Sequence, residues 1–145
     1  MNNKLDATAL RRAAAAFDNA LAFARKAELK PSEDIEFFEI ESARASVIQH
    51  FEICYELCWK MMKRFIEMDI GNEADIFTRK DLFRISAEKR LIDDFGHWVV
   101  FHWVRNMTSH VYDEEMANDI YKTAKSFAQD LHAFLKVMEE RTKLL

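Results

Sequence analysis

The sequence is poor in the residues that interrupt regular backbone, with 2 glycines and 1 proline among 145 residues. Glycine and proline mark many tight turns, so a protein built from many short strands is excluded and long helices are expected. Half of the residues are hydrophobic and 32% are charged, which is typical of a soluble helical protein. A domain of this length buries roughly 70% of the surface that its unfolded chain exposes. We therefore expect one domain over residues 1–145.

Long apolar runs are also missing. No run approaches the roughly 20 residues that cross a bilayer. The polar start Met1-Asn2-Asn3-Lys4 is not followed by the apolar core of a signal peptide. We therefore expect a cytoplasmic protein with no membrane segment.

Cysteine is scarce, and the spacing of the two cysteines disfavours a bond between them. Cys54 and Cys58 lie four positions apart on a predicted helix, where two thiols share a face without reaching disulfide geometry. His50 extends the spacing and suggests a zinc site. A closed tetrahedral site needs a fourth ligand that no neighbour supplies, and Val47 and Phe51 favour a buried face. We expect reduced thiols and no bound metal in this chain.

Positive charge is not in excess, because the net charge is −4 and the isoelectric point is about 5.7. An acidic chain is disfavoured as a protein that holds nucleic acid through bulk electrostatics. A local anion site is compatible with this charge. Any activity toward RNA would depend on a small basic patch.

Hydrophobic periodicity predicts four long helical segments and a short one. Helical spacing covers residues 6–27, then 32–68 with Ser32 as N-cap and an end near Gly71, and a shorter helix over 78–92. A fourth element contains Trp98 and Phe101, and the last helix covers 114–142. The fold class is therefore predicted to be all-α, an antiparallel up-and-down bundle of four main helices plus a short helix.

The segment from 105 to 112 combines a permanent cation, an imidazole and a phenol. Arg105 and His110 are five positions apart, which places them about 140° from each other on an ideal helix. They converge only where the backbone leaves the helix. Asp113 is a good N-cap and Glu114 and Glu115 suit a first turn, so the segment is predicted to span a junction between two helices.

The side chains of this segment favour an anionic ligand. Arginine presents a planar fork of donors that matches phosphate, and histidine exchanges a proton near neutral pH. Together they suit a phosphodiester or a nucleotide. The alternative is structural: Arg105 and His110 would tie two helices together, or the histidine would cap the last carbonyls of a helix.

The long second helix carries a polar stripe opposite its apolar face. The stripe contains Gln49, Glu52, Glu56 and Lys60. One interpretation is a solvated face, with Glu56 and Lys60 as an ordinary helical ion pair. The other is the wall of a cleft or of a subunit contact, where the carboxylates bind a cationic substrate such as an amine-rich compound.

Two separated motifs resemble a known superfamily. Arg105-Asn106, His110 and Tyr112 resemble the R-N-x-x-x-H-x-Y signature of the HEPN superfamily, which is all-helical. Upstream, residues 47–52 and 56–60 resemble the helix of its nucleotidyltransferase substrate-binding branch. The resemblance extends from about Arg44 to Tyr121.

The resemblance implies a substrate-binding subunit of a two-component nucleotidyltransferase, which is our first expectation. The chain lacks the Gly-Ser pair and spaced Asp-x-Asp of a nucleotidyltransferase, so a separate small nucleotidyltransferase chain is expected to hold the nucleotide and Mg²⁺. No cofactor is expected in this chain. The residues expected to bind substrate or partner are Gln49, Glu52, Glu56 and Lys60.

The resemblance also implies an alternative, a HepT-like metal-independent ribonuclease toxin that acts as a homodimer on RNA. His110 would then be the general acid or base, Arg105 would stabilise charge on the phosphate, and Asn106 would orient it. Tyr112 matches the position that a cognate nucleotidyltransferase antitoxin modifies with AMP. A helical scaffold with an inert Arg/His pair is the third hypothesis.

Overall fold

The computed structural model describes residues 5–29, 34–71, 77–110 and 113–143, and the side chains of residues 34–36 and 110 are outside this description. Within these ranges the elements are the helices α1 (Thr8–Glu28), α2 (Asp34–Ile70), α3 (Arg79–Glu88), α4 (Phe95–Asn106) and α5 (Glu114–Thr142), with the 3₁₀ turn η2 (Thr108–His110) between α4 and α5. The described residues contain no strand. The all-α prediction is confirmed.

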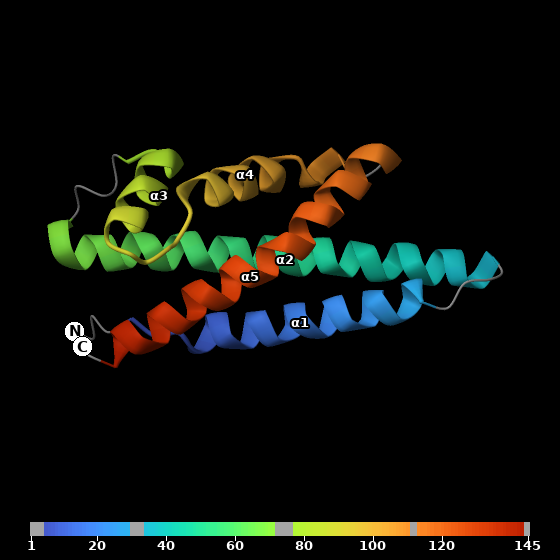
Figure 1. Ribbon diagram of the computed structural model, residues 1–145, viewed down its shortest axis with the longest axis horizontal. Helices are drawn as coiled ribbons and strands as arrows, with labels where there is room; N and C mark the ends of the chain where they lie inside the picture. Colours follow the sequence, from blue (N-terminus) through green and yellow to red (C-terminus); the bar gives the residue numbers. More distant parts are fainter. Residues whose placement is uncertain (1–4, 30–33, 72–76, 111–112, 144–145) are drawn as a thin grey trace.

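The helix α2 is the axis of the molecule (Figure 1). The helix α1 runs antiparallel to α2 along one of its sides. The helices α3 and α4 lie along another side of α2, and α5 crosses the bundle diagonally. The end of α4 and the start of α5 therefore lie away from the first turn of α1 and the last turn of α5 (Figure 1).

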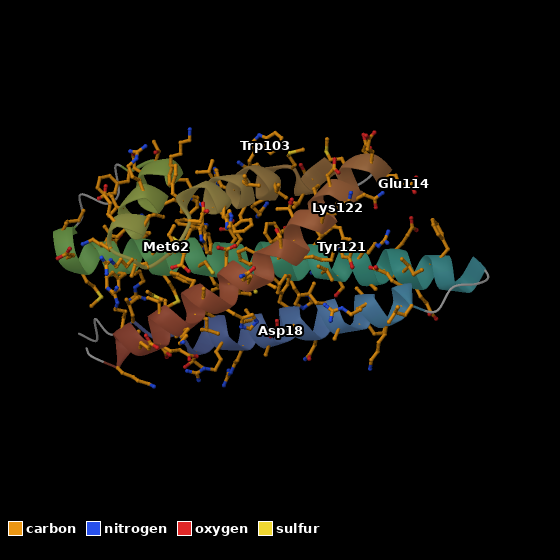
Figure 2. The ribbon with its side chains drawn as sticks, viewed as in Figure 1. Asp18, Met62, Trp103, Glu114, Tyr121 and Lys122 are labelled. Atoms are coloured by element: carbon orange, nitrogen blue, oxygen red, sulfur yellow. The ribbon has the colours of Figure 1, made fainter. Side chains whose placement is uncertain are left out.

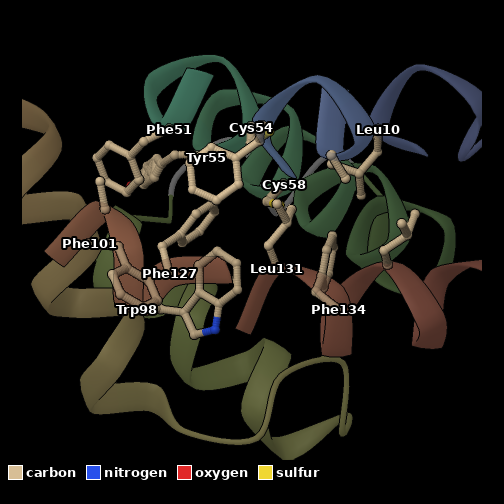
Figure 3. Packing of buried hydrophobic residues seen from close by; sticks show 14 of the residues in the cluster. Leu10, Phe51, Cys54, Tyr55, Cys58, Trp98, Phe101, Phe127, Leu131 and Phe134 are labelled. Carbon is tan, nitrogen blue, oxygen red and sulfur yellow. The ribbon is translucent and has the colours of Figure 1, made fainter. Parts of the chain in front are cut away.

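The core contains a cluster of aromatic rings to which all five helices contribute, and Figure 3 shows part of it. Phe127 of α5 packs edge-to-face against Phe51 and Phe101, with 5.0 Å between centroids in each pair, and against Trp98 at 5.6 Å. Each such pair adds about 0.5–1.5 kcal/mol beyond simple burial. This packing fixes α4 against α2 and α5, and so fixes the position of the segment that follows α4.

The two cysteines and His50 lie on or beside the core. Cys54 and Cys58 are free and fully buried, and burial raises the pKa of Cys54 to about 12 and that of Cys58 well above its usual value. The Nδ1 atom of His50 lies 2.8 Å from the carbonyl oxygen of Ser46. The described residues contain no group of three or more His, Cys, Asp or Glu side chains that could hold a metal ion. No helix within the described ranges has the length and hydropathy of a membrane span.

Local capping chemistry sets the helix boundaries. Asp113 accepts hydrogen bonds from the amides of Glu115 and Met116 at 3.1 and 3.2 Å, so the predicted start of the last helix is confirmed. The helix α2 ends just before Gly71, which adopts a positive φ of 74°. The predicted cap Ser32 lies outside the described residues.

The helix α3 is shorter than predicted. It ends at Glu88 rather than near Ile92. Arg90 adopts a left-handed φ of 62°, and the chain turns there so that Leu91 and Ile92 enter the core as loop residues. Periodicity does not distinguish buried loop residues from a last helical turn.

Candidate functional site

The segment from 105 to 110 breaks the helix as its sequence predicts. The helix α4 ends at Asn106, and the 3₁₀ turn begins at Thr108. The Thr108 hydroxyl donates to the carbonyl oxygen of Arg105 at 2.8 Å, which satisfies a carbonyl left open at the helix end. His110 therefore lies on the 3₁₀ turn and not on a continuation of α4. Its side chain, and Tyr112 as a whole, lie outside the described residues.

Arg105 is held between α2 and the 3₁₀ turn. Its Nε atom lies 3.4 Å from Glu56 Oε1, its Nη1 atom lies 4.0 Å from Glu52 Oε2, and Nη1 donates to the Thr108 hydroxyl at 3.3 Å. Its side chain is 33% exposed. The Nε atom is buried and forms no hydrogen bond with any described residue, although it is within ion-pair distance of Glu56. The described contacts of the guanidinium are therefore with the carboxylates of α2 and with the 3₁₀ turn.

The polar stripe of α2 is divided between two surroundings. Glu56 accepts a hydrogen bond from the Trp59 indole at 2.9 Å and forms its ion pair with Arg105 rather than with Lys60. Lys60 is exposed, and its Nζ atom lies 5.8 Å from the centroid of the Trp59 ring. The guanidinium of Arg79 stacks on the same indole at 3.5 Å. The structure therefore brings Glu52 and Glu56 to Arg105, but not Lys60.

A groove of about 530 Å³ lies beside Arg105, between the first half of α2, the 3₁₀ turn and the start of α5. Gln49, Glu52 and Thr108 line it together with two further carboxylates, those of Glu41 and Glu114. Its remaining lining is Phe37, Ile40, Arg44, Ala45, Ile48, Ala117 and Asn118. The groove is therefore acidic with an apolar floor, and two of the four stripe residues predicted to bind a ligand lie in it.

Arg44 is the cation of this groove, and it is already engaged. Its Nε atom lies 3.5 Å from Glu28 Oε1, and its guanidinium lies 5.1 Å from the centroid of the Tyr121 ring. The Tyr121 hydroxyl donates to the same glutamate at 2.5 Å. Burial, and then the bond to Glu28, raise the pKa of Tyr121 to about 12. These contacts leave the carboxylates as the groove's charged groups available to a ligand.

Sequence reasoning missed a series of polar contacts that leads from the buried Tyr55 to Asn106 of the motif. The Tyr55 hydroxyl lies 2.7 Å from His102 Nδ1 and accepts a hydrogen bond from Arg79 Nη1 at 3.2 Å. His102 Nε2 lies 3.4 Å from the Asn106 amide nitrogen. Burial lowers the pKa of His102, and the cations Arg79 and Arg105 lower it further. The available signal was the spacing of His102 and Asn106, which are four positions and so one helical turn apart.

Comparison with known proteins places this geometry in context. The family of proteins named "nucleotidyltransferase substrate binding protein like" matches residues 5–140. A Haemophilus influenzae protein named probable ribonuclease HepT is 38% identical over 101 residues, which are 68% of this chain and 69% of that protein.

Two solved structures share the fold. A Haemophilus influenzae protein, whose structure is said to reveal the fold of a substrate binding domain of a nucleotidyltransferase, has a TM-score of 0.80 and 29% identity over 92% of this chain and 99% of its own. A Thermus thermophilus protein has a TM-score of 0.59 and 24% identity over 84% of this chain and 98% of its own, which supports the fold alone.

Proposed function

This chain belongs to the nucleotidyltransferase substrate-binding protein-like family, and we propose that it is a metal-independent ribonuclease of the HepT type, controlled by a cognate nucleotidyltransferase. The observation that carries the proposal is the helix break after Asn106. His110 is on a separate turn that follows Arg105, whose side chain is one-third exposed. The ribonuclease name of the 38% identical relative supports it.

The chemistry of RNA cleavage suits these residues. The ribose 2′-hydroxyl attacks the adjacent phosphorus, an O2′–P bond forms, the P–O5′ bond breaks, and the leaving oxygen takes up a proton. His110 exchanges these protons as general base and acid. Arg105 donates to the phosphate oxygens as negative charge develops on them, and Asn106 orients the same group. Donors held in place by α2 and α4 lose little freedom when the transition state forms.

Control by the partner follows from the position of Tyr112. In the proposal, the partner holds ATP and Mg²⁺, the Tyr112 hydroxyl attacks the α-phosphorus, and pyrophosphate leaves. In the sequence, Tyr112 is two positions after His110 and one position before Asp113, the N-cap residue of α5. In this proposal, an AMP group on Tyr112 adds negative charge to the segment that carries the motif and so disfavours binding of a second anion there.

A second candidate function rests on the groove. Glu41, Glu52 and Glu114 line an apolar-floored groove of about 530 Å³, which suits a cationic amphipathic small molecule. In this case the chain is the substrate-binding subunit of a two-component nucleotidyltransferase. Gln49 and the carboxylates would hold the substrate, and the small catalytic partner would supply the nucleotide and Mg²⁺.

The deciding experiment uses the purified chain and a single-stranded RNA. We expect cleavage by the wild-type chain, a loss of at least about a hundredfold in His110→Ala and Arg105→Ala, and full activity in the control His132→Ala. The control histidine is half-exposed and contacts Asp18 on α1. Adding the partner with ATP should abolish cleavage by the wild-type chain but not by Tyr112→Phe.

The opposite outcome favours the second function. It consists of no RNA cleavage together with binding of spermidine, used as a cationic probe, that is lost in Glu52→Gln. Isothermal titration calorimetry measures this binding directly.

A further inference from the structure

Four polar side chains from three helices form a continuous chain that ends at the motif. Arg79 begins α3, Tyr55 lies in the middle of α2, and His102 and Asn106 are one turn apart on α4. Tyr55 is fully buried in the aromatic cluster of the core (Figure 3). The Tyr55 oxygen lies 3.2 Å from Arg79 Nη1 and 2.7 Å from His102 Nδ1, and His102 Nε2 lies 3.4 Å from the Asn106 amide nitrogen. These contacts link the aromatic core to Asn106, an exposed residue next to Arg105 in the sequence.

The donors in this chain fix its direction. Arginine only donates, so the Tyr55 oxygen accepts from Arg79 and its own O–H needs an acceptor. Among the described residues, His102 Nδ1 is the acceptor within reach. A buried hydroxyl without an acceptor is strongly disfavoured. Nδ1 therefore carries the lone pair, and the proton of the neutral imidazole is on Nε2.

The surroundings keep both rings in these states near neutral pH. Burial lowers the pKa of His102, with Arg79 and Arg105 adding to the effect and Glu56 opposing it. Burial also raises the pKa of Tyr55 above its usual range, so the hydroxyl keeps its proton. Within the described residues, the polar contacts and charged neighbours of His102 on α2, α3 and α4 are Tyr55, Glu56, Arg79, Arg105 and Asn106.

The proton on Nε2 then decides how Asn106 faces. An Nε2–H opposite the amide nitrogen would place two donors together at 3.4 Å. Turning the amide by 180° about its last bond lets Oδ1 accept from Nε2–H, and it directs the amide N–H groups to the exposed side. We propose that Tyr55 and His102 are positioning residues, which orient Asn106 so that its N–H groups donate to a phosphate oxygen of the RNA.

The phosphate contact rests on the proposed ribonuclease function, but the orientation does not. The His102 tautomer that sets this orientation can be read in the unliganded wild-type chain from the ¹⁵N shifts of the ring nitrogens. We expect a protonated Nε2 and an unprotonated Nδ1 at pH 7, and a mixture of tautomers in Tyr55→Phe. A wild-type ring protonated on Nδ1 overturns the proposal, whatever the protein does to RNA.

A double-mutant cycle tests whether Tyr55 acts through Asn106. We expect the kcat for RNA cleavage to fall about tenfold in Asn106→Ala and several-fold in Tyr55→Phe, with KM nearly unchanged. The double variant should fall no further than Asn106→Ala. Effects that multiply in the double variant would mean that Tyr55 acts independently of Asn106, and they overturn the proposal.

The control for this cycle is Tyr121→Phe. It also removes a buried hydroxyl with a hydrogen-bond partner, that of Tyr121 to Glu28, at the interface of α5 with α1. We expect it to leave kcat unchanged alone and in combination with Asn106→Ala. Thermal melts of all variants identify any that fail to fold.

If the wild-type chain cleaves no RNA, the proposed function fails and inorganic phosphate becomes the probe. A phosphate-dependent shift of the Asn106 side-chain amide signals in wild type, reduced in Tyr55→Phe, supports the positioning role. Absence of that shift in wild type overturns it.

Discussion

Arg105 is the cation around which the site is arranged, and two carboxylates of α2 compete with any anion for it. Glu56 Oε1 lies 3.4 Å from its Nε atom, and Glu52 is at the edge of ion-pair distance. Partly exposed ion pairs contribute about 0–1 kcal/mol. The carboxylates thus hold the guanidinium in place without preventing a phosphate from displacing them.

We predict that Glu56→Gln tightens the binding of a single-stranded DNA oligonucleotide by about twofold to fivefold, which corresponds to at most about 1 kcal/mol. Glutamine keeps an oxygen that can accept the Trp59 indole but removes the charge that pairs with Arg105. Fluorescence anisotropy measures the affinity, because DNA lacks the 2′-hydroxyl that attacks in RNA. Glu67→Gln is the control. Glu67 is also on α2 and forms an ion pair with a lysine at an N–O distance of 3.8 Å, and it lies about 16 Å farther along the helix than Glu56. Equal effects of the two substitutions would contradict the prediction.

His102 makes stability depend on pH in a predictable direction. Its pKa in the folded state is lowered by burial, so the unfolded chain binds the proton first as the pH falls below about 6.5. The free energy of unfolding should therefore fall as the pH drops from 7 toward 5. Urea unfolding should show a weaker fall for His102→Asn than for wild type. Asp130, whose pKa is raised by burial, acts in the opposite direction in both proteins and cancels in this comparison. Identical pH profiles would refute the assignment.

At the level of elements, sequence predicts what depends on local chemistry. Asp113 with the two glutamates after it gives the start of α5 at the correct residue, because capping involves only neighbouring amides. The contact of Glu56 with Arg105 is not predictable in this way, because it depends on how α2 packs against α4. The bond between Tyr55 and His102 joins residues 47 positions apart and depends on the same packing. The stripe on α2 was visible in the sequence, but its division between Arg105, the groove and Lys60 was not.

The cap of α5 should affect both stability and activity. We predict that Asp113→Ala costs about 1 kcal/mol in the free energy of unfolding and that Asp113→Asn costs only a few tenths, because asparagine also caps. RNA cleavage should fall severalfold in the alanine variant, since the cap borders the turn that carries His110. Asp94→Ala removes the equivalent cap at the other end of α4. It should cost similar stability while leaving cleavage intact, and equal losses of activity would contradict a local role for Asp113.

The whole molecule is acidic, which sets how it can hold RNA. With a net charge of −4, we expect binding to depend on the few cations near the motif, mainly Arg105 and Arg79. Neutralising two or three phosphates of a single strand gives a slope of about −1.4 to −2.1 in a plot of log affinity against log salt concentration. We expect this shallow slope for the DNA oligonucleotide. In Arg105→Ala the slope should become less negative by about 0.7, the contribution of one phosphate. A slope several times steeper would indicate a broad basic surface and would contradict the prediction.

We expect the proposed homodimer to form through the outer face of α4. Val100 and Trp103 are 48% and 64% exposed, they lie three positions apart on one face, and they precede Arg105 on the same helix. Figure 2 shows Trp103 on the outer side of α4, away from α2. A second copy packed on this face would cover both apolar side chains.

We therefore predict that Trp103→Glu converts a dimer into a monomer in sedimentation velocity and lowers RNA cleavage per chain by at least about tenfold. A charge placed in an apolar interface must be desolvated without a partner, which costs more than a small interface gains. Phe23→Glu is the matched control, because Phe23 is an aromatic side chain of α1 that is 60% exposed. It should leave both mass and activity unchanged. A Trp103→Glu protein that still sediments as a dimer would exclude this face, whereas an active monomer would show that one Arg105 site suffices for the chemistry.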